Sequence, residues 1–133
     1  MYNEIKIYIT FGIIFFILDL YDGKDNLYQN CKNRFLTLTV LLMHHIIASF
    51  LYFGWLSNNK YILRIHLISI IFALFLQFEN NLTCPSTDYV NSKCGLSRNN
   101  YLRDFLFFYK IKEKELYYYY VLLSFIISFY KLL

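Results

Sequence analysis

FLTLTVLLMHHIIASFLYFGWLSNNKYILRIHLISIIFALFLQFE, residues 35–79, contains two long apolar segments, at about 35–56 and 61–79. The only formally charged residues within them are Arg64, about one turn inside the second segment, and Glu79 at its end. A helix of about 20 apolar residues crosses the roughly 30 Å hydrocarbon core of a bilayer. The link at 57–60 is so short that the two helices must run antiparallel. The stretch therefore predicts a transmembrane helical hairpin.

Two further apolar segments flank this hairpin, at about 5–21 and 116–132. The first is slightly short for a span and also resembles the core of a secretory signal peptide. No small-residue cleavage site follows it, so we interpret it as a retained span. The last segment opens with four tyrosines at 117–120, which is typical of the aromatic belt at a membrane surface. The fold class predicted is an all-α, polytopic membrane protein with about four transmembrane helices in a single domain, 1–133.

The composition argues against a soluble domain. Apolar residues make up 58% of the 133 residues and charged residues 17%, against about 45–50% and about 25% in soluble domains. A small soluble domain cannot bury so much apolar surface. The abundance of Tyr, Phe, Ile, Asn and Lys is also what an AT-rich genome produces. The net charge of +4 is spread over several loops, which suits anionic lipid headgroups and indicates no nucleic-acid partner.

The region between the third and fourth spans is polar. Residues 80–100 have the composition of a cysteine-containing loop. Residues 101–112 begin with an apolar segment too short to cross a bilayer, which predicts an interfacial helix or a re-entrant piece.

Two signals disagree about the orientation of the chain. Four spans place both termini on one side and both longer loops on the other, and most Lys and Arg residues lie in the longer loops. The positive-inside rule therefore predicts cytoplasmic long loops. Asn81 begins an Asn-Leu-Thr glycosylation pattern, which would require a lumenal loop instead.

The three cysteines, Cys31, Cys84 and Cys94, all fall on the long-loop side. In an oxidising compartment, Cys84 and Cys94 would form a short-loop disulfide, whereas in the cytoplasm they would remain thiols. Zinc binding together with Cys31 is a further alternative, but the spacing matches no zinc motif.

Three histidines lie within predicted spans: His44 and His45 near the middle of the second, and His66 in the third. Polar side chains at such depth are costly and face a partner or water. They can serve as hydrogen-bonding groups between helices, as metal or haem ligands, or as acid–base groups acting on a lipid-like or quinone-like substrate. Adjacent residues point about 100° apart, so His44 and His45 cannot face one neighbour.

Two carboxylates, Asp19 and Glu79, lie at span ends on the long-loop side. Such groups commonly sit among headgroups at helix ends. The alternative is a small polar cluster at one membrane surface, with His45 below it.

The order His66 … Glu79 … Cys84-Pro85-Ser86-Thr87 … Asn91 resembles a family of small four-span membrane proteins of unknown function. Those proteins also place an intramembrane histidine before a Cys-Pro-x-Thr turn. The resemblance covers about the middle third of the chain, and the paired His44-His45 and the added Cys94 depart from it. The resemblance implies the same four-span architecture and no particular chemistry. Separately, the composition of the chain is similar to that of viral membrane proteins.

Two functional hypotheses follow. The preferred one is a structural or interaction role within the bilayer, in which the chain packs with itself or with a membrane partner. The alternative is a membrane-embedded enzyme, or a redox or metal carrier, that uses His44, His45, His66 and Glu79 on a lipid-like substrate. Haem or metal is compatible with this alternative, but the sequence requires no cofactor.

Overall fold

The computed structural model describes residues 2–22, 29, 31–81, 83–96 and 114–133. Within these ranges the chain is helical and contains no strand. The elements are α1 (Tyr2–Asp22), α2 (Arg34–Phe53), the 3₁₀ helix η1 (Gly54–Leu56), α3 (Lys60–Glu79), α4 (Pro85–Cys94) and α6 (Lys114–Leu132). The all-α class predicted from the sequence is confirmed.

The four long helical segments coincide with the four predicted apolar segments, to within a few residues at each end. Two of them are long and apolar enough to cross a membrane, Arg34–Leu56 and Lys60–Glu79. Helix α1 has suitable length but carries four charged residues, Glu4, Lys6, Asp19 and Asp22. Helix α6 is less apolar because it opens with charged residues and four tyrosines.

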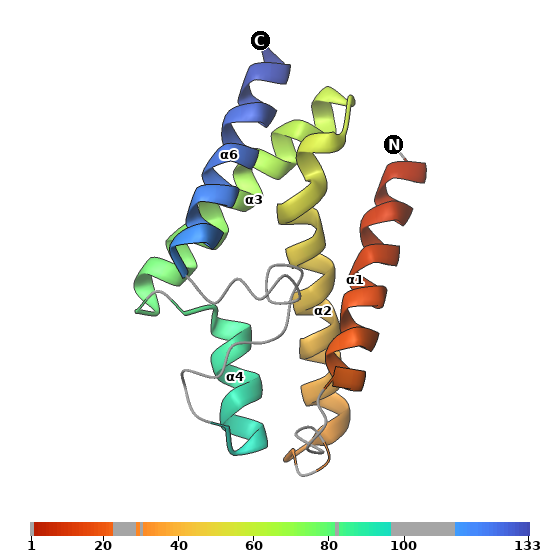
Figure 1. The fold of residues 1–133 in the computed structure, drawn as a ribbon, viewed down its shortest axis with the longest axis vertical. Helices are drawn as coiled ribbons and strands as arrows, with labels where there is room; N and C mark the ends of the chain where they lie inside the picture. The colour runs from red at the N-terminus through yellow and green to blue at the C-terminus, as the bar shows by residue number, and fades with distance from the viewer. Residues whose placement is uncertain (1, 23–28, 30, 82, 97–113) are drawn as a thin grey trace.

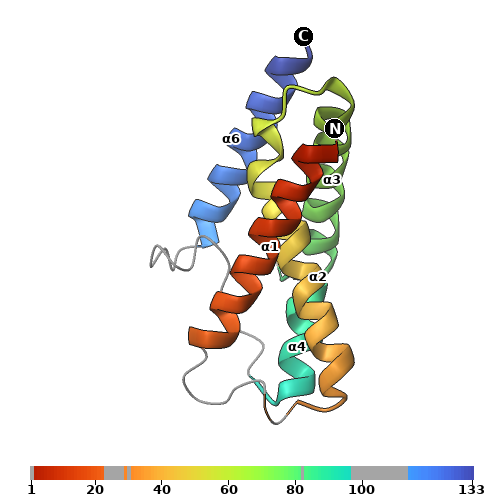
Figure 2. The same cartoon turned by 90° about the vertical axis from the view of Figure 1, so that its right-hand side faces the viewer.

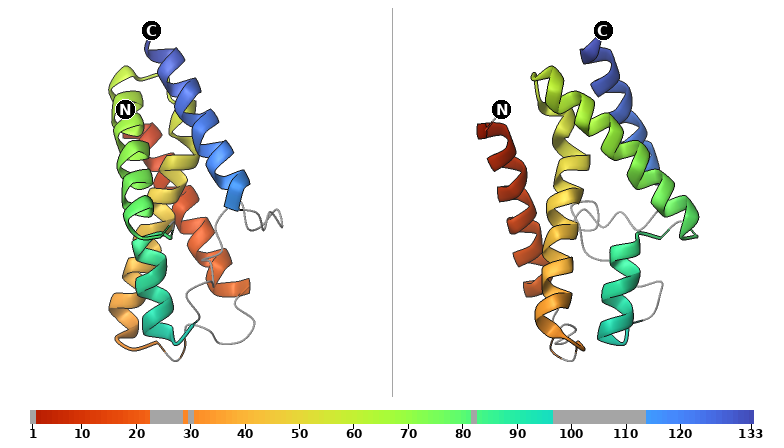
Figure 3. Two further views of the ribbon diagram at one scale, coloured as in Figure 1. Left: turned by 90° about the vertical axis from the view of Figure 1, so that its left-hand side faces the viewer. Right: turned by 180° about the vertical axis from the view of Figure 1, so that it is seen from behind.

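The long helices form two antiparallel pairs, α1 with α2 and α3 with α6 (Figure 1). The hairpin of α2 and α3 is present, but the two helices diverge from their shared turn, so α3 packs mainly against α6 (Figure 3). Both termini lie at the end of the bundle that carries this turn (Figure 2). Helix α4 lies at the opposite end, packed against α2.

Helix α4 lies within the segment predicted to be a loop, so that part of the prediction is wrong. Cys84 is the N-cap, Pro85 occupies the first turn, and Gly95 closes the helix in the left-handed conformation with φ 70°. Proline at a helix start and glycine after its end are common helix boundaries. The predicted interfacial segment, 101–112, lies outside the described residues.

Polar contacts join the helices at the carboxyl end of α2. The carbonyl of Leu51 accepts hydrogen bonds from Ser124 Oγ at 3.3 Å and lies 3.1 Å from His66 Nε2. Tyr120 donates its hydroxyl hydrogen to the carbonyl of Tyr52 at 2.9 Å. The last carbonyls of a helix lack partners within it. Side chains of α3 and α6 therefore satisfy the end of α2 and fix how the two pairs of helices meet.

The space beside Gly54 sets how closely η1 and α3 approach. A Cβ added there would overlap the imidazole ring of His66. We expect Gly54→Ala to destabilise the bundle by about 1–3 kcal/mol, because overpacking forces the ring out of its position. Unfolding by denaturing detergent in mixed micelles measures this change. Leu56→Ala, in the same short helix but half exposed, is the control; equal effects of both substitutions would contradict the prediction.

Candidate functional site

A buried acid–imidazole pair joins α1 to α2. Asp19 Oδ2 lies 3.0 Å from His45 Nε2, and both side chains are at most 1% exposed. The last turn of α1 supplies the carboxylate and the middle of α2 the imidazole. The sequence hypothesis grouped Asp19 and Glu79 above His45; the structure places Asp19 against His45, while Glu79 is exposed elsewhere. The Nε2 hydrogen of His45 can bond to the carboxylate whether the ring is neutral or protonated.

The other ring nitrogen of His45, Nδ1, is buried and has no hydrogen-bond partner among the described residues. The rings of His45 and His44 meet edge to face, with centroids 5.4 Å apart. Consecutive residues of α2 therefore direct two imidazoles into different surroundings, as expected from their 100° separation. His45 faces α1, and His44 faces α4.

A cluster of three polar side chains lies where α2 meets the start of α4. His44 Nδ1 is 2.9 Å from Ser86 Oγ, and Ser86 Oγ is 2.9 Å from Cys84 Sγ. The triangle closes with 3.7 Å between Cys84 Sγ and His44 Nδ1. All three side chains are half-buried. We call this group the thiol–imidazole cluster; it contains a nucleophile, a base and a hydroxyl that bonds to both.

The turn between α3 and α4 holds Cys84 in place. The Asn80 side-chain amide donates to the Thr83 carbonyl at 3.1 Å and to Asp88 Oδ2 at 2.8 Å. The Asp88 backbone N–H in turn donates to the Cys84 carbonyl at 3.1 Å. Pro85 restricts Cys84 to extended backbone, seen as φ −70° and ψ 129°. These constraints direct the thiol toward α2.

The pKa of Cys84 reflects this environment. Burial alone raises the pKa of the thiol, but the hydrogen bond and charge of His44 and the two hydrogen bonds from Ser86 outweigh it and lower the pKa to about 6. The free thiol also lies at the N-terminus of α4, where the helix dipole favours negative charge. At neutral pH the thiolate predominates.

Alkylation of Cys84 should therefore follow an unusual pH profile. We expect the rate of iodoacetamide labelling to be half-maximal near pH 6, because the reactive thiolate persists down to that pH. Mass spectrometry of the labelled protein in detergent measures it. Replacing His44 by Gln should move the midpoint upward by at least one pH unit. A midpoint near pH 9 in the unmodified protein would contradict the assignment.

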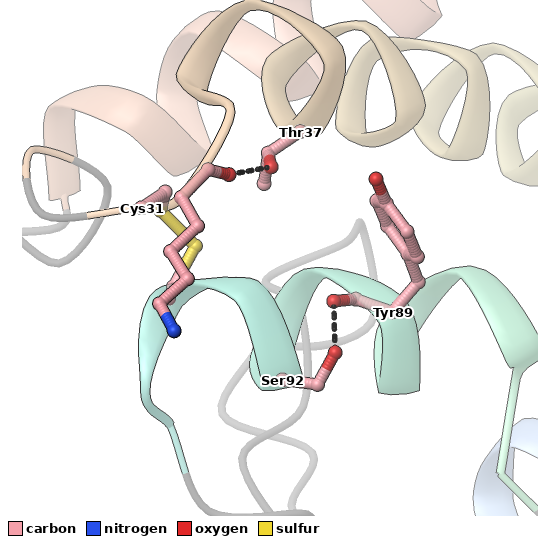
Figure 4. Close-up of a disulfide and its surroundings, with 6 residues drawn as sticks. Cys31, Thr37, Tyr89 and Ser92 are labelled. Atoms are coloured by element: carbon pink, nitrogen blue, oxygen red, sulfur yellow. Dashed lines mark hydrogen bonds between the residues drawn. A yellow bond between two sulfur atoms is a disulfide. The ribbon is translucent and has the colours of Figure 1, made fainter.

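The disulfide pairing differs from the prediction. Cys94 is bonded to Cys31, and Cys84, the predicted partner, is a free thiol. Figure 4 shows the bridge linking the segment before α2 to the carboxyl end of α4. Beside it, the Lys32 backbone N–H donates to the Lys93 carbonyl at 2.8 Å. The disulfide also removes Cys31 and Cys94 as zinc ligands, which overturns the zinc alternative.

His66 lies in a separate site. Its Nδ1 is 2.8 Å from Ser128 Oγ of α6, and its Nε2 faces the α2 carbonyl of Leu51. Both nitrogens are thus committed to bonds between helices, which agrees with the interpretation of an interhelical hydrogen-bonding group.

The remaining candidates stay apart from these sites. Glu79 is exposed at the end of α3, and Asn81 is exposed in the following turn with φ 53°. Among the residues that the structure describes, no three His, Cys, Asp or Glu side chains group as metal ligands. The sequence pattern predicted no role for Ser86 or Ser128, although the Cys-Pro-Ser order at a helix start was an available signal for Ser86.

Comparisons with protein-family models, with curated proteins and with solved structures give no match for this chain. The resemblance to small four-span membrane proteins therefore stays a prediction.

Proposed function

We propose that the chain is a four-span integral membrane protein with a structural role in the bilayer. Its bundle holds the disulfide-linked polar helix α4 against the first half of α2, at the end of the bundle away from the termini. Its outward faces contact lipid and neighbouring membrane proteins, including further copies of the chain. The observation that carries this proposal is the combination of apolar outward faces on all four long helices with polar contacts between them.

The outward faces are lined by large apolar side chains. Those more than half exposed occur on every long helix, among them Ile17, Phe35, Met43, Ile68, Phe78, Leu122 and Phe129. Soluble monomers rarely expose apolar patches of such extent. In a bilayer, acyl chains would cover these faces, so the apolar side chains would not be exposed to water.

The contacts between helices suit a lipid environment. Ser49 Oγ donates to the Tyr8 carbonyl at 2.6 Å, and Gln77 Nε2 donates to Tyr117 Oη at 2.9 Å. Gly12 lets α1 approach the backbone of α2 at Ile46 closely. Hydrogen bonds and small residues at helix contacts hold helices together in membranes, where apolar burial alone gives no preference for association.

We further propose that the long-loop side faces an oxidising compartment. The Cys31–Cys94 bridge supports this, because disulfides persist in oxidising compartments and are rare in the cytosol. The proposal reverses the cytoplasmic placement predicted from basic residues. Both termini would then be cytoplasmic, since they lie at the other end of the bundle.

Two experiments test these proposals. The protein should stay with the membrane pellet after alkaline carbonate extraction, and recovery in the supernatant would refute the integral placement. In sealed vesicles of known orientation, a membrane-impermeant maleimide should label Cys84 from the lumenal or external side. Labelling from the cytoplasmic side alone would refute the orientation and leave the integral placement intact.

A further inference from the structure

The thiol–imidazole cluster is distinct from the packing contacts that support a structural role. His66 and the Asp19–His45 pair join helices in the interior. Cys84, His44 and Ser86 are instead half-buried, at the point where the end of α3 turns into α4. The cluster combines a nucleophile, a base and a hydroxyl group that bonds to both. The packing of α4 against α2 does not need this combination of side chains.

We propose that Cys84 accepts an acyl group from a long-chain acyl thioester, with His44 as the base. The inference rests on the membrane placement proposed above. Cys84 follows the apolar helix α3 by a few residues and contacts His44 near the middle of α2, so in the proposed placement the thiol would lie below the level of the headgroups. An electrophile carried on a long acyl chain partitions into the bilayer and can reach that depth.

The surroundings suit an acyl chain. Ile47 lies three residues from His44 on α2, in the direction of η1, and is 53% exposed. Phe78, near the end of α3, is 74% exposed. Residues three apart share a helix face, so an acyl chain lying along α2 has an apolar path that ends beside His44.

The transfer is a balanced exchange of thioesters. The Cys84 thiol gives its proton to His44, directly across 3.7 Å or through the Ser86 hydroxyl. The Sγ electron pair attacks the carbonyl carbon, and negative charge develops on the carbonyl oxygen beside the amino end of α4. The bond from carbon to the carrier sulfur then breaks, and the leaving thiolate takes the proton from His44. One thioester is consumed and one is formed, and no redox partner is needed.

The acidity of the thiol supports this chemistry. A pKa of about 6 gives a thiolate at neutral pH that is still nucleophilic. Asp88 Oδ2 accepts a hydrogen bond from Asn80, and Asp88 is not among the groups that shift the pKa of the thiol. His44 of α2 is the charged group that lowers the pKa of the thiol.

The test uses the full chain in lipid nanodiscs with alkyne-tagged palmitoyl-CoA as the probe. We expect one hydroxylamine-sensitive label on Cys84, measured by peptide mass spectrometry. Cys84→Ser should abolish the label, and His44→Gln should slow its formation at least tenfold, as expected for loss of a general base. Ser92→Ala is the matched control, since Ser92 is an exposed α4 residue whose hydroxyl donates to the Tyr89 carbonyl within its own helix. An intact Cys31–Cys94 bridge, seen by mass, certifies folding of each variant.

Three outcomes would overturn the proposal: no label on the wild-type protein, an equal label on Cys84→Ser, or an unchanged rate in His44→Gln. Rapid iodoacetamide alkylation without acyl transfer would show a reactive thiol with a different electrophile, which also refutes the acyl assignment. The alkaline carbonate wash needs no acyl donor, so it tests the membrane placement on its own. A failure of that placement can therefore be told apart from a failure of acyl transfer.

Discussion

Replacing His45 by Leu is expected to destabilise the bundle by about 3–5 kcal/mol. The substitution leaves the Asp19 carboxylate buried beside an apolar side chain, and the loss of one member of a buried pair has this magnitude. Both side chains are at most 1% exposed, so water cannot replace the imidazole without opening the contact between α1 and α2. Unfolding by denaturing detergent, followed by circular dichroism, measures the loss.

A double-mutant cycle separates the pair from the rest of the packing. Asp19→Leu combined with His45→Leu should recover most of the lost stability, because apolar replacement of a whole buried pair is often neutral or stabilising. Met43→Leu, on the same helix but 51% exposed, should change stability by less than about 0.5 kcal/mol. Additive losses in the double mutant would show that Asp19 and His45 contribute independently, which contradicts the pairing.

The four long helices could be predicted because each coincides with a long apolar segment of the sequence, and two of them are long and apolar enough to cross a membrane. Helix α4 could not be predicted by that criterion, since its composition is polar. Its boundaries were nevertheless present in the sequence: Pro85 at the start, Asp88 in the first turn and Gly95 at the end. Turn-forming residues are common both in loops and at helix ends, and in this segment they mark the two ends of a short helix.

The predicted Cys84–Cys94 disulfide is wrong because it assumed that residues 80–100 form a loop. Cys84 and Cys94 are close in sequence, which favours a bridge in a loop. Once 85–94 is helical, the two cysteines lie about 15 Å apart along its axis, beyond the reach of a disulfide. Cys94 instead meets Cys31, 63 positions away in the sequence, because α4 packs against α2, and that packing cannot be read from the sequence.

The candidate site was predicted only in part. Asp19 and His45 could be associated because both are polar groups in apolar surroundings, which must find partners. The contact of His44 with Cys84 depends on where α4 docks, and no local pattern specifies that. The separate roles of His44 and His45 follow from the helix geometry, but the identity of each neighbour does not.

Removing the Cys31–Cys94 bridge is the second change with a large expected effect. The bridge closes a loop with a sequence separation of 63 residues. The chain-entropy relation assigns about 4 kcal/mol to a loop of that length, which is an upper figure if the unfolded chain retains helices that already restrict it. The double variant Cys31→Ala/Cys94→Ala should therefore unfold at lower denaturing-detergent concentration than the parent protein.

The same variant should also change the chemistry of Cys84, because the bridge holds one end of α4 and the thiol–imidazole cluster lies at the other. Loosening α4 separates Cys84 from His44, and the pKa of the thiol should return from about 6 toward its ordinary value. The midpoint of iodoacetamide labelling measures this shift. Ser92→Ala, which leaves the bridge intact, is the control for changes in α4. If the bridge-free variant kept both its stability and a midpoint near pH 6, contacts such as that of the buried Val90 with Leu41 would suffice to hold α4. The coupling between the disulfide and the cluster would then be refuted.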